Sequence, residues 1–316
     1  MKFNWRNRML TCLLLGWVLS AATPAAMGQF VSTGGPLKGG GRLKAIAANG
    51  KVVLAGIVGA SLSSGHLFRS INNGQSWLEV NALNGEPVQS LACGYSACFA
   101  GTNKGVYRSL DDGQTWRLMH KTSGTVTALV SFALRVAAGT NDGKIFASQN
   151  NGSTWTATNF QGGFVTEVVF GGGQGLYAST YSGAWKSADG GNTWIAINNG
   201  LTDQTTTAFA ATGKLFVGTG SAGVFASKND GALWAPANKG ATLKGVRVLS
   251  LIYNRMFAGG YKSGVFVSTD NGESWSPISG LGSPAVWSIG GDPDGANVFA
   301  GTDEGLVYRL LPAKRK

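Results

Sequence analysis

Carboxylate and carboxamide side chains recur along this chain at one position of an eight-residue phrase, which is clearest at residues 109–116. The phrase has the pattern Ser-x-Asp/Asn-x-Gly-x-Ser/Thr-Trp, and its tryptophans are separated by 39, 39, 39, 40 and 41 residues. Carboxylates can act as general acids or bases, but a group repeated once per period belongs first to the architecture of the repeated unit. The third and eighth positions are Asn72, Asp111, Asn150, Asp189, Asn229 and Asp270, and Trp77, Trp116, Trp155, Trp194, Trp234 and Trp275.

The phrase has a local explanation that does not need catalysis. An Asp or Asn at its third position can accept hydrogen bonds from the amides of its own turn. The glycine two residues later, such as Gly113, can take the positive φ that a side chain disfavours, and the tryptophan can cover the hairpin. The fifth copy has Leu233 in place of Ser or Thr, so we expect that turn to lack one hydroxyl hydrogen bond.

The remaining polar residues do not assemble a recognisable active site. A glycosidase needs two carboxyl groups that converge on the scissile bond, whereas the acids outside the phrases lie mostly in short glycine-rich connections. A sialidase needs arginines that bind the substrate carboxylate, but Arg69, Arg108 and Arg309 occupy equivalent repeat positions and are expected to be structural. Catalysis is therefore the less favoured hypothesis, with glycoside hydrolysis as its form, and no cofactor is expected.

Cys93 and Cys98 flank a four-residue segment between two expected strands. Cysteines across a short hairpin are within reach of one another, and an oxidising compartment favours their disulfide. A redox or metal-binding pair is the competing interpretation, but only His66 and His120 could add imidazole ligands. We expect a structural disulfide and no metal site.

The period near 40 residues contains four short strands. In the second repeat, apolar or β-branched runs at 88–92, 97–101, 105–109 and 115–119 are separated by Gly, Asn and Asp. Repeated four-stranded antiparallel units that close around an axis form a β-propeller, which hides its sheet edges. Seven first-strand segments begin near Leu43, Val88, Val126, Val165, Thr206, Val246 and Val286, which predicts seven blades in an all-β fold.

The last repeat stops without a fourth strand. Residues 29–33, around Phe30, occupy the place that the strand after the tryptophan takes in the other repeats. We therefore predict that an N-terminal strand completes the seventh blade and closes the ring.

The phrase resembles the Asp-box, or BNR repeat, and the resemblance extends over nearly the whole chain. Propellers of this kind include sialidases, xyloglucanases, fucose-binding lectins, the sortilin ectodomain and photosystem II assembly factors. The resemblance implies that the boxes lie away from the binding face and are not catalytic. The chain departs from the photosystem type, because its second strands, such as 53–56, lack Gly-Trp pairs.

The N-terminus is typical of an export signal. Lys2, Arg6 and Arg8 precede an apolar run at 9–22, and small residues follow it. We expect residues 1–28 to be a cleavable signal peptide and residues 29–316 to form one propeller domain in the periplasm or outside the cell. The mature chain would contain no transmembrane segment, since no second apolar run follows.

The 26 basic residues exceed the 15 acidic ones, and the excess persists without the three in the N-terminal segment. A basic surface favours an acidic protein partner or an anionic glycan. No nucleic-acid-binding motif is present, so we expect no nucleic-acid partner. The oligomeric state is not indicated.

When the first strands of the seven repeats are aligned, the residues at one equivalent position form a column that is polar or amphipathic in otherwise apolar surroundings. The column formed by the next residue of each first strand contains small side chains, except for Glu167. Glu167 could form an internal ion pair with Lys44 or Arg247, or these residues could join Trp287 in a binding site at the channel mouth. The polar column is Lys44, Gln89, Thr127, Thr166, Thr207, Arg247 and Trp287.

Loops on the rim opposite the boxes supply further candidate contacts. They carry Lys104, Tyr181, Tyr261 and Lys262, and Tyr with Lys is typical of recognition surfaces. The enlarged connection at 56–64 lies on the same rim. Together these features predict an exported, non-enzymatic binding or assembly scaffold for a protein partner. The alternative is a carbohydrate-binding or glycoside-hydrolase propeller.

Overall fold

A computed structural model describes residues 28–34, 37, 41–83, 85–94, 96–243, 245–282 and 284–312. The expected signal peptide therefore lies outside the described residues except for Gly28. No helix in the described part of the chain is both long and apolar enough to span a membrane.

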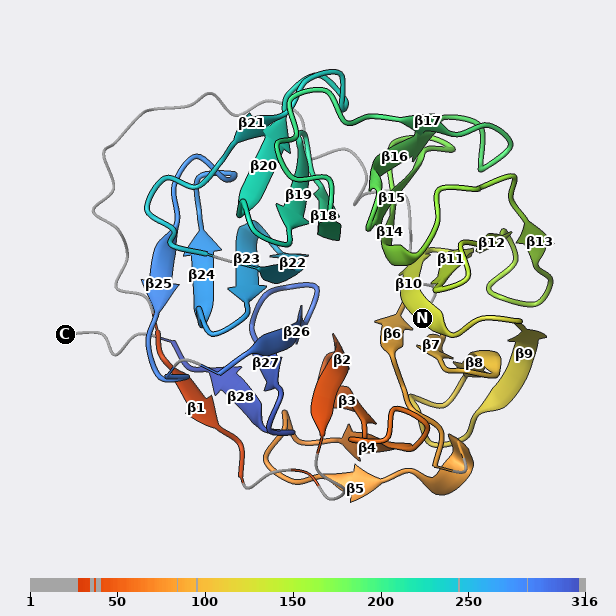
Figure 1. Ribbon diagram of the computed structural model, residues 1–316. Coiled ribbons are helices and arrows are strands. Elements are labelled where there is room, and N and C mark those ends of the chain that lie inside the picture. The colour runs from red at the N-terminus through yellow and green to blue at the C-terminus, as the bar shows by residue number, and fades with distance from the viewer. Residues whose placement is uncertain are drawn as a thin grey trace, which may run out of the picture.

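Seven four-stranded antiparallel sheets surround a central axis (Figure 1), which confirms the predicted propeller. Four consecutive strands form each of the first six blades, with the first strand innermost. Blades 1 to 3 are β2 (Arg42–Asn49), β3 (Val52–Val58), β4 (Gly65–Ser70) and β5 (Leu78–Glu79); β6 (Ser90–Cys93), β7 (Cys98–Gly101), β8 (Gly105–Ser109) and β9 (Arg117–Lys121); and β10 (Val126–Phe132), β11 (Arg135–Thr140), β12 (Ile145–Ser148) and β13 (Thr156–Ala157).

The pattern continues through blades 4 to 6. Their strands are β14 (Val165–Phe170), β15 (Leu176–Thr180), β16 (Gly183–Ser187) and β17 (Ile195–Ala196); β18 (Thr206–Ala211), β19 (Leu215–Thr219), β20 (Val224–Ser227) and β21 (Ala235–Pro236); and β22 (Val246–Ile252), β23 (Arg255–Gly260), β24 (Val265–Ser268) and β25 (Ser276–Ile278). A short 3-10 helix, η2 (Asn81–Leu83), connects blades 1 and 2.

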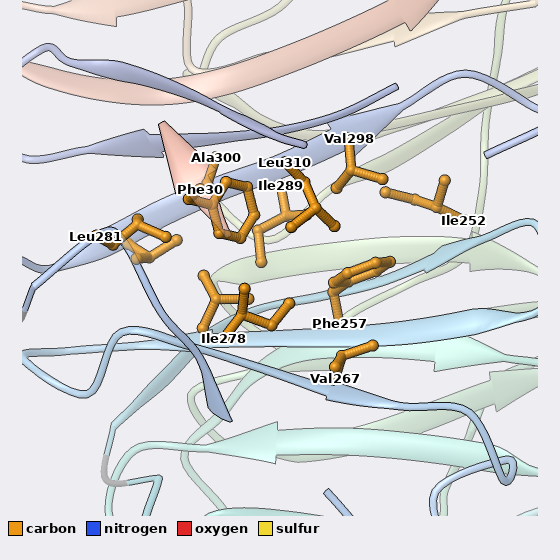
Figure 2. Close-up of a cluster of buried hydrophobic side chains, with 12 residues drawn as sticks. Phe30, Ile252, Phe257, Val267, Ile278, Leu281, Ile289, Val298, Ala300 and Leu310 are labelled. Carbon is orange, nitrogen blue, oxygen red and sulfur yellow. The ribbon is translucent and has the colours of Figure 1, made fainter. Parts of the chain in front are cut away.

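The two ends of the chain form the seventh blade together, as predicted. β1 (Phe30–Ser32) pairs with β28 (Val307–Leu310), which follows β26 (Val286–Gly291) and β27 (Val298–Thr302). The Phe30 amide also donates to the carbonyl of Ser279 in blade 6, at 2.9 Å. The Phe30 ring is buried beside Ile278 and Leu310 (Figure 2). The propeller is therefore closed both by strand pairing and by the packing of this side chain.

The core consists of apolar clusters between neighbouring blades, because both faces of every sheet are covered. A glycine in the second strand often makes room for the first side chain of the next blade. A Cβ on Gly101 would lie 2.6 Å from Cγ1 of Val126, and one on Gly139 would lie 2.4 Å from Cγ1 of Val165. These glycines therefore allow the first strands to crowd around the axis.

Candidate functional site in the central channel

An open cavity of about 740 Å³ follows the propeller axis and is lined by the first strands of all seven blades. The polar column predicted from the sequence lines this cavity. We call its members the channel ring: Lys44, Gln89, Thr127, Thr166, Thr207, Arg247 and Trp287. The structure thus brings together seven residues that are far apart in the sequence.

A β-bulge accompanies the ring position in every blade except the second. The register between first and second strands skips this residue, for example between Val126 and Ala128 and between Leu43 and Ala45. A bulge inserts one extra residue and redirects the side chains around it. The same backbone irregularity therefore accompanies Lys44, Arg247 and Trp287 in three neighbouring blades.

Three threonines of the channel ring have a structural role. The hydroxyl of Thr127 donates to the carbonyl of Val165 at 2.5 Å, and that of Thr166 donates to the carbonyl of Thr206 at 2.9 Å. Thr207 makes the equivalent bond to Val246. Each bond links a blade to the next one, which satisfies buried polar groups where the strands converge.

The other side of the channel carries positive charge around one indole. We call Arg42, Lys44, Arg247 and Trp287 the cationic arc. Lys44 Nζ lies 4.3 Å from the Trp287 ring centroid, and the guanidinium carbons of Arg247 and Arg42 lie 4.8 and 5.1 Å from it. A tryptophan face attracts cations. The attraction to Trp287 therefore offsets part of the repulsion among these three positively charged side chains.

Two donors in the cationic arc are buried without a hydrogen-bond partner among the described residues. They are Nε of Arg247 and Nε1 of Trp287. Because buried donors are nearly always satisfied in native proteins, each exception requires an explanation. Both residues also line the open cavity. Arg42 was missed from the sequence, although it lies in the same strand as Lys44.

Burial in the channel shifts the pKa values of two residues toward neutrality. Burial lowers the pKa of Lys44 to about 8, and repulsion from Arg247 and Arg42 adds to this while Glu167 opposes it. Burial raises the pKa of Glu167 to about 7, against the hydrogen bond from the Val168 amide and the attraction of Lys44. The pair therefore interacts across the channel.

The interpretation of Glu167 as a member of a direct ion pair is wrong. No ion pair joins it to any residue that the structure describes. It lines the same cavity as Lys44 and Arg247, but it projects from blade 4, on the other side of the ring from blades 7 and 1 (Figure 1). The physical reason is the channel itself, which separates the opposite charges.

The predicted rim residues divide into two groups. Tyr181 lines the channel and stacks on Phe164, with ring centroids 4.7 Å apart. Lys104 instead pairs with the buried Glu86, and Lys262 lies 5.6 Å from the ring of Tyr261. Lys104, Tyr261 and Lys262 lie outside the cavity lining, although Tyr261 is half exposed on the rim.

The Asp-boxes are saturated with internal hydrogen bonds. The amide and hydroxyl of Thr193, together with the hydroxyl of Ser187, hold the pKa of Asp189 at about 2. A carboxylate so strongly held in its ionised form is a poor general acid or base near neutral pH. Leu233 supplies only its amide to Asn229, at 3.0 Å, and the hydroxyl bond of the other boxes has no counterpart there.

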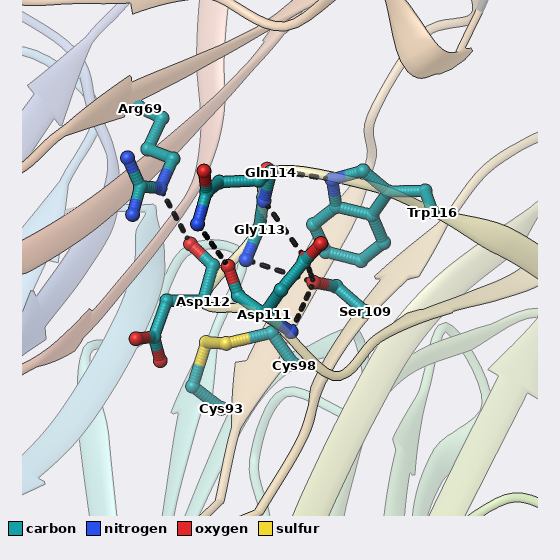
Figure 3. Close-up of a disulfide and its surroundings, with 9 residues drawn as sticks. All are labelled: Arg69, Cys93, Cys98, Ser109, Asp111, Asp112, Gly113, Gln114 and Trp116. Carbon is teal, nitrogen blue, oxygen red and sulfur yellow. Dashed lines mark hydrogen bonds between the residues drawn. A yellow bond between two sulfur atoms is a disulfide. The ribbon is translucent and has the colours of Figure 1, made fainter.

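Figure 3 shows the second Asp-box beside the cysteine pair. Cys93 and Cys98 are bonded as a disulfide across the β6–β7 hairpin, with their Cα atoms 4.1 Å apart. Nε of Arg69 in blade 1 donates to the carbonyl of Asp112 in this box at 2.7 Å. The box therefore also connects neighbouring blades.

The indole nitrogens of the boxes do not all donate within their own hairpins. Nε1 of Trp116 donates to Gly113 of its own box at 3.0 Å, whereas Nε1 of Trp275 reaches Ala237 of the preceding blade at 2.9 Å. Trp234 and Trp275 are consequently buried between blades. Beyond the predicted hairpin cover, the indoles of these two copies therefore also contribute to the packing between blades.

No group of three or more His, Cys, Asp or Glu side chains could hold a metal ion within the portion of the chain described by the structure. Only one acid, Glu167, lines the channel there.

The family model of the BNR/Asp-box repeat matches residues 266–277, which include the whole sixth box. The chain therefore combines a seven-bladed β-propeller fold with a match to the Asp-box repeat in its sixth blade. No curated protein matches it.

Solved structures are similar to this chain at the level of fold. YCF48 bound to D1 peptide has a TM-score of 0.69 and 15% identity, with 88% of this chain and 96% of that chain covered. YCF48 from Cyanidioschyzon merolae has a TM-score of 0.68 and 13% identity, with 90% and 98% covered. The GH74 xyloglucanase from Xanthomonas campestris has a TM-score of 0.64 and 14% identity over 89% of this chain, which spans 53% of that enzyme.

Proposed function

We propose that this propeller is a non-enzymatic binding or assembly scaffold that recognises a protein partner through the channel mouth and the adjoining rim. The observation that supports this most strongly is the cationic arc, where Arg247 and Trp287 line an open cavity and each holds a buried donor without a partner among the described residues. A built site with unsatisfied donors is expected to bind an acceptor-bearing group.

The electrostatics of the channel favour a carboxylate-bearing segment. Arg247, Lys44 and Arg42 surround one indole, and the arginines provide forked donors suited to carboxylates. The rim adds half-exposed Tyr181 and Tyr261, and exposed tyrosine contributes contact area at modest entropic cost.

Glycoside hydrolysis has less support. Two carboxyl groups must flank a scissile bond, and Glu167 is the only acid in the part of the cavity wall that the structure describes. The xyloglucanase likeness covers about half of that enzyme and carries the fold alone. YCF48 bound to D1 peptide illustrates that a propeller of this size can bind a peptide, again as an analogy of fold.

Export from the cytoplasm forms part of the proposal. The basic and apolar N-terminal pattern supports it, and a structural disulfide between Cys93 and Cys98 suits an oxidising compartment. We place the protein in the periplasm or outside the cell.

Affinity capture from an envelope extract tests the function. The wild-type protein is compared with a Lys44→Glu, Arg247→Glu variant and with a Lys51→Glu, Arg117→Glu control, which makes the same charge change at exposed sites away from the cavity lining. Thermal unfolding verifies that each variant is folded. Loss of a partner only in the first variant supports the site. Equal recovery by both variants contradicts it, and release of sugar from a glycan panel would favour the hydrolase.

A further inference from the structure

Blade 4 builds a second kind of subsite on the channel wall. Glu167 lines the cavity together with Phe164 and Tyr181, whose rings are stacked at an interplanar angle of 21°. Glu167 lies in β14, Phe164 comes just before that strand, and Tyr181 lies in the turn between β15 and β16. The cationic arc comes from blades 6, 7 and 1, so the two groups occupy different sides of the ring (Figure 1).

Glu167 is an ionisable group without a cationic contact. Its carboxylate accepts the Val168 amide and feels Lys44 only through space, while no ion pair joins it to a described residue. A carboxylate in a confined site is costly when unpaired. An incoming ammonium or guanidinium group would provide the missing partner.

The aromatic pair adds an independent preference for a cation. Tyr181 is half exposed at the channel, and it lies against Phe164 with ring centroids 4.7 Å apart. Aromatic faces attract Lys and Arg side chains, and the attraction increases when the cation is partly desolvated. No cation–π contact involves either ring among the described residues.

We infer that the channel mouth is a bipolar site for a peptide segment of mixed charge. A carboxylate of the segment binds Arg247 and Trp287 of the cationic arc, and a lysine or arginine of the same segment binds Glu167 and the rings of Tyr181 and Phe164. This inference rests on the proposed function, and it changes the expected partner from simply acidic to one with both charges close together.

The simplest competing explanation for Glu167 predicts that its neutralisation has the opposite effect on binding affinity. If Glu167 only offsets the charge of Lys44, Arg42 and Arg247, its neutralisation would strengthen binding of every acidic segment. If Glu167 binds a cation of the ligand, its neutralisation would weaken binding of a mixed segment and remove the preference for lysine. The two explanations therefore differ in the direction of the Glu167→Gln effect.

Synthetic peptides provide a probe that does not require the natural partner. The set is acetyl-Glu-(Gly)n-Lys-amide with one to four glycines, together with versions in which Gln replaces Glu or Lys. Affinities are measured calorimetrically for the wild type, Glu167→Gln and Arg247→Gln. Glu304→Gln is the matched control, since Glu304 is exposed and lies outside the cavity lining.

For at least one spacer length, we expect the lysine to improve wild-type affinity by about tenfold, as an ion pair reinforced by a cation–π contact suggests. Glu167→Gln should abolish the gain in affinity from the peptide lysine and leave the gain from the peptide glutamate intact. Arg247→Gln should abolish the gain from glutamate and leave the gain from lysine intact. Glu304→Gln should leave both gains unchanged. Stronger binding by Glu167→Gln, a lysine gain that survives it, or no measurable binding of any peptide would overturn the inference.

Affinity capture with Glu167→Gln separates this inference from the proposed function. If the Lys44→Glu, Arg247→Glu variant loses the partner while Glu167→Gln retains it fully, the function stands and the bipolar site is rejected. If both variants lose it and the peptides behave as expected, both stand. Equal capture by all variants rejects the partner site, and the peptides alone then decide whether the channel is bipolar.

Discussion

A guanidinium nitrogen of Arg108 in blade 2 donates to the carbonyl oxygen of Asn151 in blade 3 at 2.7 Å and to the hydroxyl of Ser153 at 3.0 Å. Asn151 has a φ of 55°, in the left-handed region, inside the third Asp-box. Arg69 makes the equivalent contact with Asp112 of the second box. The repeated phrase thus shapes a hairpin and also supplies a carbonyl oxygen that accepts a hydrogen bond from an arginine of the preceding blade.

Arg108→Ala should therefore destabilise the ring. Removal of two hydrogen bonds from a charged donor is expected to lower the free energy of unfolding by ~1–3 kcal/mol. Urea unfolding measures the change, with Arg117→Ala as a control at an exposed arginine of the same blade, for which less than ~0.5 kcal/mol is expected. Equal losses from the two substitutions would refute the inter-blade role.

The fifth Asp-box should gain stability from Leu233→Ser. In the first box, Nδ2 of Asn72 donates to the Ser76 hydroxyl at 2.9 Å, and the exposed Leu233 supplies no such acceptor to Asn229. We expect a gain of ~0.5–1 kcal/mol, and a similar loss from Ser76→Ala. Chemical unfolding of both variants checks this, and a neutral or negative effect of Leu233→Ser would show that leucine contacts outweigh the missing bond.

Glu167→Gln should change the pH dependence of stability. Because burial raises the pKa of Glu167 from 4.5 to about 7, the folded state retains a proton in this interval that the unfolded chain has released. Wild-type stability therefore falls as pH rises from 4.5 to 7, and the Gln variant lacks this contribution. The Glu167 residue as a whole is only half-buried, so we expect an advantage of only ~1 kcal/mol for the variant at pH 8 and none near pH 4. Thermal unfolding across this range measures it, and parallel pH profiles would be the contrary result.

Lys44→Met should stabilise the protein below pH 8. Burial and the two arginines lower the pKa of Lys44 from 10.5 to about 8, so folding a protonated Lys44 costs free energy at neutral pH. Between these values the unfolded chain binds the extra proton, and the wild type gains stability as pH rises. We expect the variant to be more stable by ~1 kcal/mol at pH 7 and the difference to shrink toward pH 10.5. A Lys44→Met protein that unfolds more readily at pH 7 would show that its attraction to Trp287 dominates.

The repeat period made the architecture predictable from the sequence. Each phrase marks one hairpin, and the unpaired last repeat pointed to Phe30 as the closing strand, as β1 confirms. Strand ends were less accurate, since the fourth strand of the second repeat is Arg117–Lys121 and not 115–119. Its irregular register with β8 depends on local backbone geometry that period alone does not specify.

Only part of the channel site could be predicted in the same way. Alignment of the repeats identified Lys44, Arg247 and Trp287 as members of one ring, because equivalent positions of a propeller share a height on the axis. The alignment did not identify Arg42 or Phe164, which lie outside that column and contribute through contacts between neighbouring segments. It also suggested a direct ion-pair partner for Glu167, and no ion pair joins this residue to any described one.

Site-specific photo-crosslinking in the native compartment tests the central claim, that the partner occupies the channel mouth, most directly. A photoreactive residue replaces Gln89, which lines the channel, or Gln75, an exposed residue of the first Asp-box. We expect a covalent adduct with one protein partner from position 89 that the Lys44→Glu, Arg247→Glu substitutions abolish, and no such adduct from position 75. An adduct formed only from position 75 would instead place the partner on the Asp-boxes and rule out binding at the channel mouth.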